Sequence, residues 1–179
     1  PEQEPPTPPT IWVASAETRI ERITLAPGPT AAPTEVPRYR TVMPPATTLH
    51  YGLQRGLWSG TGELVWQPSG EHYEARLEGH VAGLRVLTQI SQGGFDHAGI
   101  APLRFTDQRL RQVKAANFQR DKGKLTYSGS SAEVALIPGA QDRLSWMIQL
   151  AAVVNAEPKY AQAGGKVAMF VTGVRADAD

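Results

Sequence analysis

From about Leu49 onward, apolar and polar residues alternate with a period of two, which is the pattern of half-buried β-strands. In the stretch HYEARLEGHV one face carries Tyr73, Ala75, Leu77 and Val81, and the other carries His72, Glu74, Arg76, Glu78 and His80. Similar short segments follow up to about residue 137, separated by turn sequences such as PSGE, Gly93-Gly94 and DKGK. We therefore predict many short strands, joined in order by tight turns.

The pattern changes to a helical one in the stretch GAQDRLSWMIQLAAVV, residues 139–154. Asp142 stands just before the apolar run, where a short acceptor side chain caps a helix, and Pro158 ends the helix. Apolar side chains form two stripes around a narrow polar line of Asp142, Ser145 and Gln149: one stripe is Leu144, Met147, Ile148, Ala151 and Val154, the other Trp146, Leu150 and Val153. A helix this apolar should be covered on most sides.

These elements predict a mainly β fold, in which an antiparallel meander forms a curved sheet or half-barrel wrapped around one apolar α-helix. No crossover helices separate the strands, so a parallel α/β sheet is not expected. The late stretch KVAMFVTGV is apolar on both faces, and we expect it to be a strand that is buried on both sides or pairs centrally.

The N-terminal quarter of the chain has a different composition, because 11 of the 15 prolines lie between Pro1 and Pro45. We expect residues 1–47 to be a proline-rich linker, extended or loosely docked, and residues 48–179 to be the domain. Within the linker, residues 11–26 could form a strand or, slightly favoured, a short helix. We expect Pro1 to be a processing boundary, with an anchoring segment upstream of it.

Composition excludes several classes of chemistry. The chain has no cysteine, which removes disulfides, zinc ribbons and thiol nucleophiles. A net charge of +1 gives no strong overall field for nucleic acid, and no nucleic-acid partner is expected. No apolar run reaches the roughly 20 residues that span a bilayer. The absence of cysteine suits cytoplasm and periplasm equally, so it leaves the compartment open.

The segments GELVWQPSGEHYEARLEG, GIAPLRFTDQR and GAQDRLSWMIQLA, followed by GGKVAMFVTGVRADAD, resemble the bacterial domain-of-unknown-function 3108 family over roughly residues 49–179. The resemblance implies an exported, periplasmic envelope protein with an N-terminal membrane segment and a proline-rich spacer. It supplies no activity and no catalytic residues. Members continue with further strands, so the resemblance implies a domain cut short at its C-terminal end.

The candidate catalytic and metal-binding residues are few. The four histidines, His50, His72, His80 and His97, lack the close spacing of a zinc site, and we expect solvent-facing roles and no metal. Asp96 and His97 could join Ser91 or Ser128 in a Ser–His–Asp arrangement, but no nucleophile elbow is present, and turn chemistry explains them better. Gly60-x-Gly62 lacks the following helix of a nucleotide cradle.

A basic stretch runs through the second half of the predicted sheet: Arg109, Arg111, Lys114, Arg120, Lys122 and Lys124. Such a stretch could contact an anionic partner, namely a lipid headgroup, a lipopolysaccharide phosphate or a cell-wall polymer. The alternative is a solvated hairpin whose charges protect a sheet edge.

The favoured hypothesis is a non-enzymatic binding module of the cell envelope, without a cofactor, that holds a lipophilic or anionic envelope molecule. The predicted ligand-binding residues are Trp146, Met147, Ile148, Leu150 and Phe170. The alternative is a structural or protein-interaction module without a small ligand, and a hydrolase comes third. An unfilled apolar cavity would favour the first hypothesis, and a cavity filled by helix side chains the second. For Asp142 we expect a capping role, not a chemical one.

Overall fold

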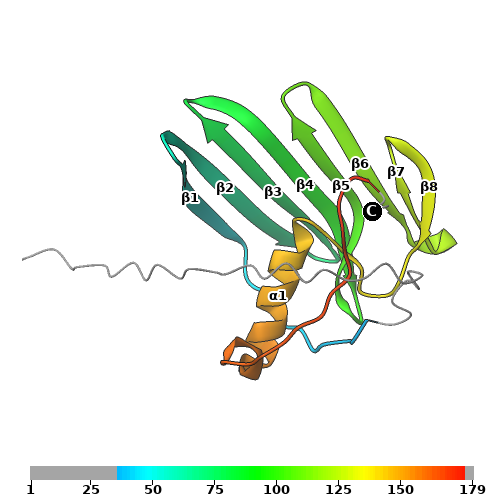
Figure 1. Ribbon diagram of the computed structural model, residues 1–179. Coiled ribbons are helices and arrows are strands. Elements are labelled where there is room, and N and C mark those ends of the chain that lie inside the picture. Colours follow the sequence, from blue (N-terminus) through cyan, green and yellow to red (C-terminus); the bar gives the residue numbers. More distant parts are fainter. Residues whose placement is uncertain (1–35, 176–179) are drawn as a thin grey trace, which may run out of the picture. The chain divides into compact units, whose positions relative to one another are not determined.

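The computed structural model describes residues 36–175. Eight strands form one antiparallel sheet in chain order, each paired with the next, and the sheet does not close into a barrel (Figure 1). The strands are β1 Thr47–Arg55, β2 Trp58–Ser69, β3 His72–Val81, β4 Leu84–Asp96, β5 Gly99–Arg109, β6 Gln112–Gln119, β7 Lys124–Tyr127 and β8 Ser130–Ala135. The predicted mainly β meander with one helix is confirmed.

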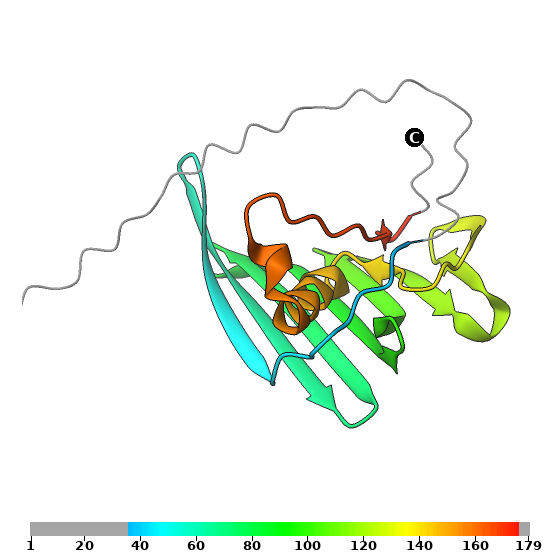
Figure 2. The same cartoon turned by 90° about the horizontal axis from the view of Figure 1, so that it is seen from below.

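The remaining elements are short apart from the helix. They are η1 Arg120–Lys122, β9 Gln141–Asp142, α1 Ser145–Ala156, η2 Pro158–Ala161 and β10 Val171–Thr172. Figure 2 shows α1 within the curve of the sheet. The core between them contains Trp66, Phe105 and Phe118 from the sheet and Leu144 and Ile148 from the helix segment.

Bulges bend the sheet. The register shifts between Gly79 and His80, between Gln92 and Gly93, and between Thr126 and Tyr127, and such shifts increase the local twist of a strand. The sequence predicts that Gly93-Gly94 ends a strand, and this prediction is wrong: both glycines lie inside β4. A Cβ on Gly93 would stand 2.3 Å from the carbonyl oxygen of Ala101, so the neighbouring strand passes too close for any side chain.

Residues 36–46 have no regular structure, yet several of them are fixed to the domain. The Val42 N–H donates to the Ala152 carbonyl at 2.9 Å, and the Trp66 indole N–H donates to the Pro44 carbonyl at 3.0 Å. Met43 packs against the core. The folded unit therefore begins several residues before the boundary that we expected at 47/48.

The stretch KVAMFVTGV is not the long, doubly buried strand that we predicted. Only Val171 and Thr172 pair, and they pair in parallel with Gln141 and Asp142 in a separate two-stranded sheet. Residues 166–170 before them are exposed or half-buried. The apolar pattern could not distinguish an extended covering segment from a strand, because both expose alternate sides.

The possible strand or helix predicted at residues 11–26 lies outside the residues that the structure describes. Among residues 36–175, no helix combines the length and the apolar character needed to cross a bilayer.

Candidate functional site

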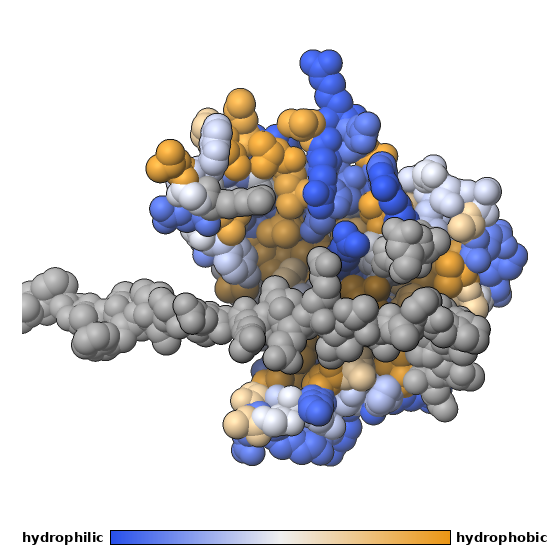
Figure 3. Space-filling model, viewed as in Figure 1, coloured by the Kyte–Doolittle hydropathy of each residue, from blue (hydrophilic) through white to orange (hydrophobic). Residues whose placement is uncertain are grey.

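An apolar groove lies on the concave face of the sheet, beside the first turn of α1. Its volume is about 240 Å³. Four strands and the helix line it, and the apolar lining side chains are Tyr51, Leu53, Leu64, Leu77, Leu87 and Met147. Figure 3 shows apolar surface in the hollow on this face of the molecule.

The floor of the groove is made by two glycines that face each other across neighbouring strands. Gly62 of β2 pairs with Gly79 of β3, and both belong to the groove lining. A Cβ on Gly62 would meet Tyr51 side-chain atoms at 3.6 Å, which is ordinary contact, so a side chain would fit there and fill the space. The groove is therefore deep because these two positions carry no side chain.

Polar side chains stand on the same concave face, farther along the sheet. Arg109 of β5 pairs directly with Leu87, and its Nε lies 3.1 Å from Asp107 Oδ1. Asp107 is buried and also accepts a hydrogen bond from the Gln89 amide at 2.9 Å. Lys114 pairs with Asp107 across β5 and β6 and is half-buried. Near the groove, the concave face is thus apolar over β1–β4 and charged over β5–β6, where Arg109, Asp107 and Lys114 stand.

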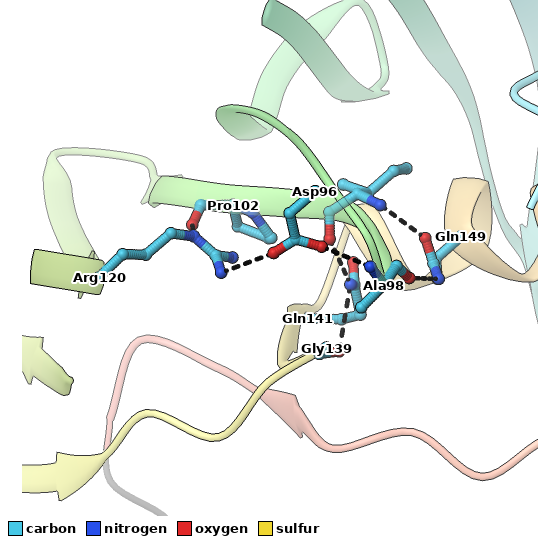
Figure 4. Close-up of polar contacts among 8 residues, drawn as sticks. Asp96, Ala98, Pro102, Arg120, Gly139, Gln141 and Gln149 are labelled. Atoms are coloured by element: carbon cyan, nitrogen blue, oxygen red, sulfur yellow. Dashed lines mark hydrogen bonds and ion pairs between the residues drawn. The ribbon is translucent and has the colours of Figure 1, made fainter. Parts of the chain in front are cut away.

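The helix is oriented with its polar line inward, which is the reverse of the usual arrangement. Gln149 is buried: its Oε1 accepts from the Ile100 N–H at 2.8 Å, and its Nε2 donates to the Ala98 carbonyl at 2.7 Å (Figure 4). Ser145 is buried as well. These contacts hold α1 against the β4–β5 turn and so place Met147 at the groove.

The β4–β5 turn is itself held by polar contacts (Figure 4). Asp96 accepts the Ala98 N–H at 2.8 Å and pairs with Arg120 at 3.2 Å, while the Gln141 amide donates to the Ile100 carbonyl at 2.8 Å. Asp96 therefore serves the turn, as turn chemistry predicts, and orients Arg120.

Asp142 lies in a buried polar network. Its Oδ1 accepts the N–H groups of Leu144 and Ser145, both at 2.8 Å, and the Asp142 N–H donates to Ser145 Oγ at 2.9 Å. This reciprocal pair has the pattern of a capping box, but it precedes the regular helix: α1 begins at Ser145, and its N-cap residue is Leu144, which makes no side-chain cap. The second carboxylate oxygen of Asp142, Oδ2, accepts a hydrogen bond from Ser91 Oγ at 2.6 Å, and Ser91 Oγ is also hydrogen-bonded to the Tyr73 hydroxyl at 2.9 Å.

Burial sets the electrostatics of this network. Desolvation raises the pKa of the Asp142 carboxyl, although the hydrogen bonds from Ser91, Leu144 and Ser145 act in the opposite direction. Desolvation and the nearby Asp142 also raise the pKa of the Tyr73 hydroxyl well above its usual range. Ser91 and Asp142 are both fully buried, so the network lies within the packed interior and supports the fold.

The structure separates the ligand-binding residues that the sequence suggested. Met147 lines the groove. Ile148 is buried in the core, and Phe170 is half-buried against it. Leu150 is half-buried, and Trp146 is 37% exposed on the outer side of the helix. The helix is therefore covered on fewer sides than its composition predicts.

The basic residues fall into two groups at opposite ends of β6, roughly 23 Å apart at ~3.3 Å per residue. Arg109, Arg111 and Lys114 lie near the β5–β6 turn, and Arg120, Lys122 and Lys124 lie in η1 and the start of β7. In the second group Lys124 pairs with Glu133 at 2.5 Å and Arg120 pairs with Asp96. The single basic hairpin that we expected is not formed.

The residues that line the groove from the sheet were missed. Tyr51, Leu53, Leu64, Leu77 and Leu87 were seen only as apolar faces of separate strands. The signal that could have found them is the set of strand glycines at 60, 62 and 79 on those same faces. Their significance depends on the register, which pairs Gly62 with Gly79.

Two larger hollows, of about 530 and 560 Å³, lie at the other end of the sheet. Both contain His72 and Leu103. The remaining lining of the first is largely polar, with Gln67, Ser69, Glu74, Gln92 and Arg104. The second mixes Glu71, Asp96 and Arg120 with Phe95, Ala101 and two glycines. They are wide, open depressions at the surface. Over the described part of the chain, no group of three or more His, Asp or Glu residues could hold a metal ion.

Comparisons with known proteins do not identify the chain: no protein-family model, no curated protein and no solved structure matches it. The resemblance to the domain-of-unknown-function 3108 family stays a prediction. The function must therefore be argued from the groove itself.

Proposed function

We propose that this chain binds an amphipathic molecule that has a slender apolar chain and a polar or anionic head. The observation that carries the proposal is the open groove, whose side chains are almost all apolar and whose floor is two paired glycines. Its volume of about 240 Å³ lies just below the range of about 300–1,000 Å³ of drug-sized ligand pockets. A single acyl or isoprenoid chain fits such a groove better than a bulky ring system.

The charged part of the concave face supports the choice of an amphipathic ligand. Arg109 stands directly across from Leu87 of the groove, and Lys114 lies on the next strand. An apolar chain in the groove would have its head beside these two cations. Asp107 partly neutralises Arg109 at 3.1 Å, so Lys114 is the stronger candidate for the contact with an anionic head.

A lipophilic ligand also agrees with the cell-envelope location that the family resemblance implies. We therefore include a periplasmic or envelope location in the proposal. Fold-level analogy to lipid carriers adds little, because one fold serves many functions.

The groove can be tested by filling its floor. We expect a hydrophobic fluorescent probe such as N-phenylnaphthylamine to bind the folded chain saturably and to be displaced by long-chain fatty acids. Gly62→Val should weaken probe binding at least roughly tenfold. The valine side chain occupies the floor of the groove, and the probe then loses apolar contact area comparable to one buried Val side chain. The matched control is Gly52→Val on β1, where a Cβ meets nothing within 4 Å. Equal probe affinity in both variants would refute the groove as the site.

The head contact has its own test. Lys114→Glu should reduce the affinity for fatty-acid anions more than the affinity for the matching fatty alcohols, since only the anion gains from a cation. Lys122→Glu removes an exposed lysine at the far end of β6 and should change neither affinity. If Lys114→Glu lowers the affinity for both ligand classes equally, the head does not lie at Lys114.

The alternative is a protein-interaction module, and the two edges of the sheet favour it. Among residues 36–175, β1 and β8 each pair on one side only, and an unpaired edge can accept a strand from another protein. This function predicts no saturable probe binding, so the same titration distinguishes the two.

A further inference from the structure

Three hairpin turns carry large apolar side chains at one end of the sheet. Because consecutive strands run antiparallel, the β1–β2, β3–β4 and β5–β6 turns lie at the same end, which is uppermost in Figure 1. Leu57 is fully exposed, and Trp58, Leu84 and Leu110 are 71%, 72% and 76% exposed. We call these four residues the hairpin-tip surface.

Neither turn chemistry nor packing explains these side chains. Leu110 has φ 53°, a left-handed conformation in which Gly or Asn is favoured and a leucine is strained. A fully exposed leucine such as Leu57 gains nothing from burial in the part of the chain that the structure describes. Polar residues would form the turns at lower cost, so the leucines at these positions point to a contact outside the chain.

The charges beside the tips have one sign. The stretches 55–58, 82–85 and 109–111 contain Arg55, Arg85, Arg109 and Arg111 and no aspartate or glutamate. Arg85 and Arg109 pair with Glu78 and Asp107 farther along the sheet. Arg111 is exposed and pairs with no acid among the described residues. The end of the sheet is thus both apolar and cationic.

We propose that the hairpin-tip surface docks on a lipid bilayer that contains anionic phospholipids. The three leucines and Trp58 enter the interfacial region, where tryptophan is favoured, and the neighbouring arginines bind lipid phosphates, for which the guanidinium is well shaped. Adjacent turns are about 10 Å apart, two strand spacings. Separate apolar side chains with cations between them suit a fluid surface, whereas a protein interface has a contiguous, close-packed apolar centre.

Docking in this way would bring the groove to the membrane. Leu53, at one wall of the groove, is four residues from Leu57 on the same hairpin. The helix, by contrast, is tied to the turns at the opposite end through Gln149. The docking proposal rests on the tip residues alone and does not require a ligand in the groove.

Vesicle binding tests the apolar part of the proposal. The full chain is sedimented with vesicles of phosphatidylcholine alone and of equal parts phosphatidylcholine and phosphatidylglycerol. We expect binding to the anionic vesicles that weakens with salt. Leu57→Ser and Leu110→Ser should each lower the partition coefficient roughly tenfold. Leu103→Ser is the matched control, because Leu103 is 49% exposed but lies away from the tips.

A second pair of variants tests the charges. Arg111→Glu should weaken binding to anionic vesicles and leave binding to neutral vesicles unchanged, whereas Arg104→Glu, on the outer face near the other end, should change neither. The tip variants should keep the parent's affinity for the fluorescent probe, which separates this proposal from the groove proposal. Absence of vesicle binding by the parent chain, or equal binding by the tip and control variants, would overturn it. So would a tip variant that alters only the oligomeric state in sedimentation velocity.

Discussion

At the scale of single residues, the contacts of Asp142 predict a large effect on stability. Its side chain accepts three hydrogen bonds in a fully buried place. Asp142→Ala leaves the N–H groups of Leu144 and Ser145 and the Ser91 hydroxyl without that acceptor, at a cost of about 1–3 kcal/mol for each buried group left unsatisfied. We expect a loss of roughly 3 kcal/mol in the free energy of unfolding, measured by urea denaturation. Asp142→Asn keeps the main-chain acceptor and should cost much less. Equal losses in the two variants would contradict a capping role.

The raised pKa of Asp142 predicts a pH dependence. Because the folded state holds this proton more tightly than the unfolded state, the carboxyl contributes stability that is present below its unfolded pKa of about 3.9 and is lost as pH rises toward its folded pKa. Asp142→Asn has no such proton. The unfolding free energy of the Asn variant, relative to the parent, should therefore increase as pH rises above about 4. A relative stability that does not change with pH would show that the hydrogen bonds offset the desolvation completely.

Trp146 and Ile148 are both apolar residues of α1, but they differ in burial, which the sequence does not show. Trp146 is 37% exposed on the outer side of α1, while Ile148 is 7% exposed in the core. We expect Ile148→Ala to cost about 2–5 kcal/mol, as for a buried aliphatic side chain, and Trp146→Ala to cost less, about 1 kcal/mol. Thermal and urea unfolding of the two variants measures the order. A greater loss for Trp146→Ala would mean that the ring is covered.

At the scale of the element, α1 is positioned by one polar side chain. Gln149→Leu would keep the volume but leave two groups without their partner: the Ala98 carbonyl in the β4–β5 turn and the Ile100 N–H at the start of β5. Two unsatisfied buried groups predict a loss of about 2–4 kcal/mol. Gln162→Leu, at an exposed position after the helix, is the control. If both variants unfold at the same urea concentration, Gln149 does not hold the helix.

The same helix shows where sequence reasoning succeeds and where it stops. Alternation predicted the strands and their order well, because one wet face and one buried face impose a period of two. The direction in which α1 faces could not be predicted in this way. Hydrophobicity places Ser145 and Gln149 outward, but the β4–β5 turn offers an unpaired N–H and carbonyl that only a polar side chain can satisfy. The groove was missed for a similar reason, since it depends on the pairing of Gly62 with Gly79.

At the scale of the whole domain, the two ends of the sheet differ. One end is occupied by α1, the N-terminal segment and the polar contacts of the β4–β5 turn. The other end has the groove, the exposed apolar turns and the unpaired Arg111 among the described residues. The first end is thus covered and the second is left open, which is the arrangement that a binding site next to a surface requires.

The segment before β1 gives the last prediction. Met43 packs on the core, and the Pro44 carbonyl is the acceptor for the buried indole N–H of Trp66. A chain that begins at residue 47 loses both contacts, while a chain that begins at residue 36 keeps them. Partial burial of a methionine and one hydrogen bond together predict a difference of roughly 3 kcal/mol in the free energy of unfolding. Met43→Ala in the longer chain should reproduce part of this loss, because it removes the apolar contact and leaves the Pro44 carbonyl in place. Urea denaturation of the three chains measures the effect, and identical midpoints would show that the segment before β1 only covers the domain.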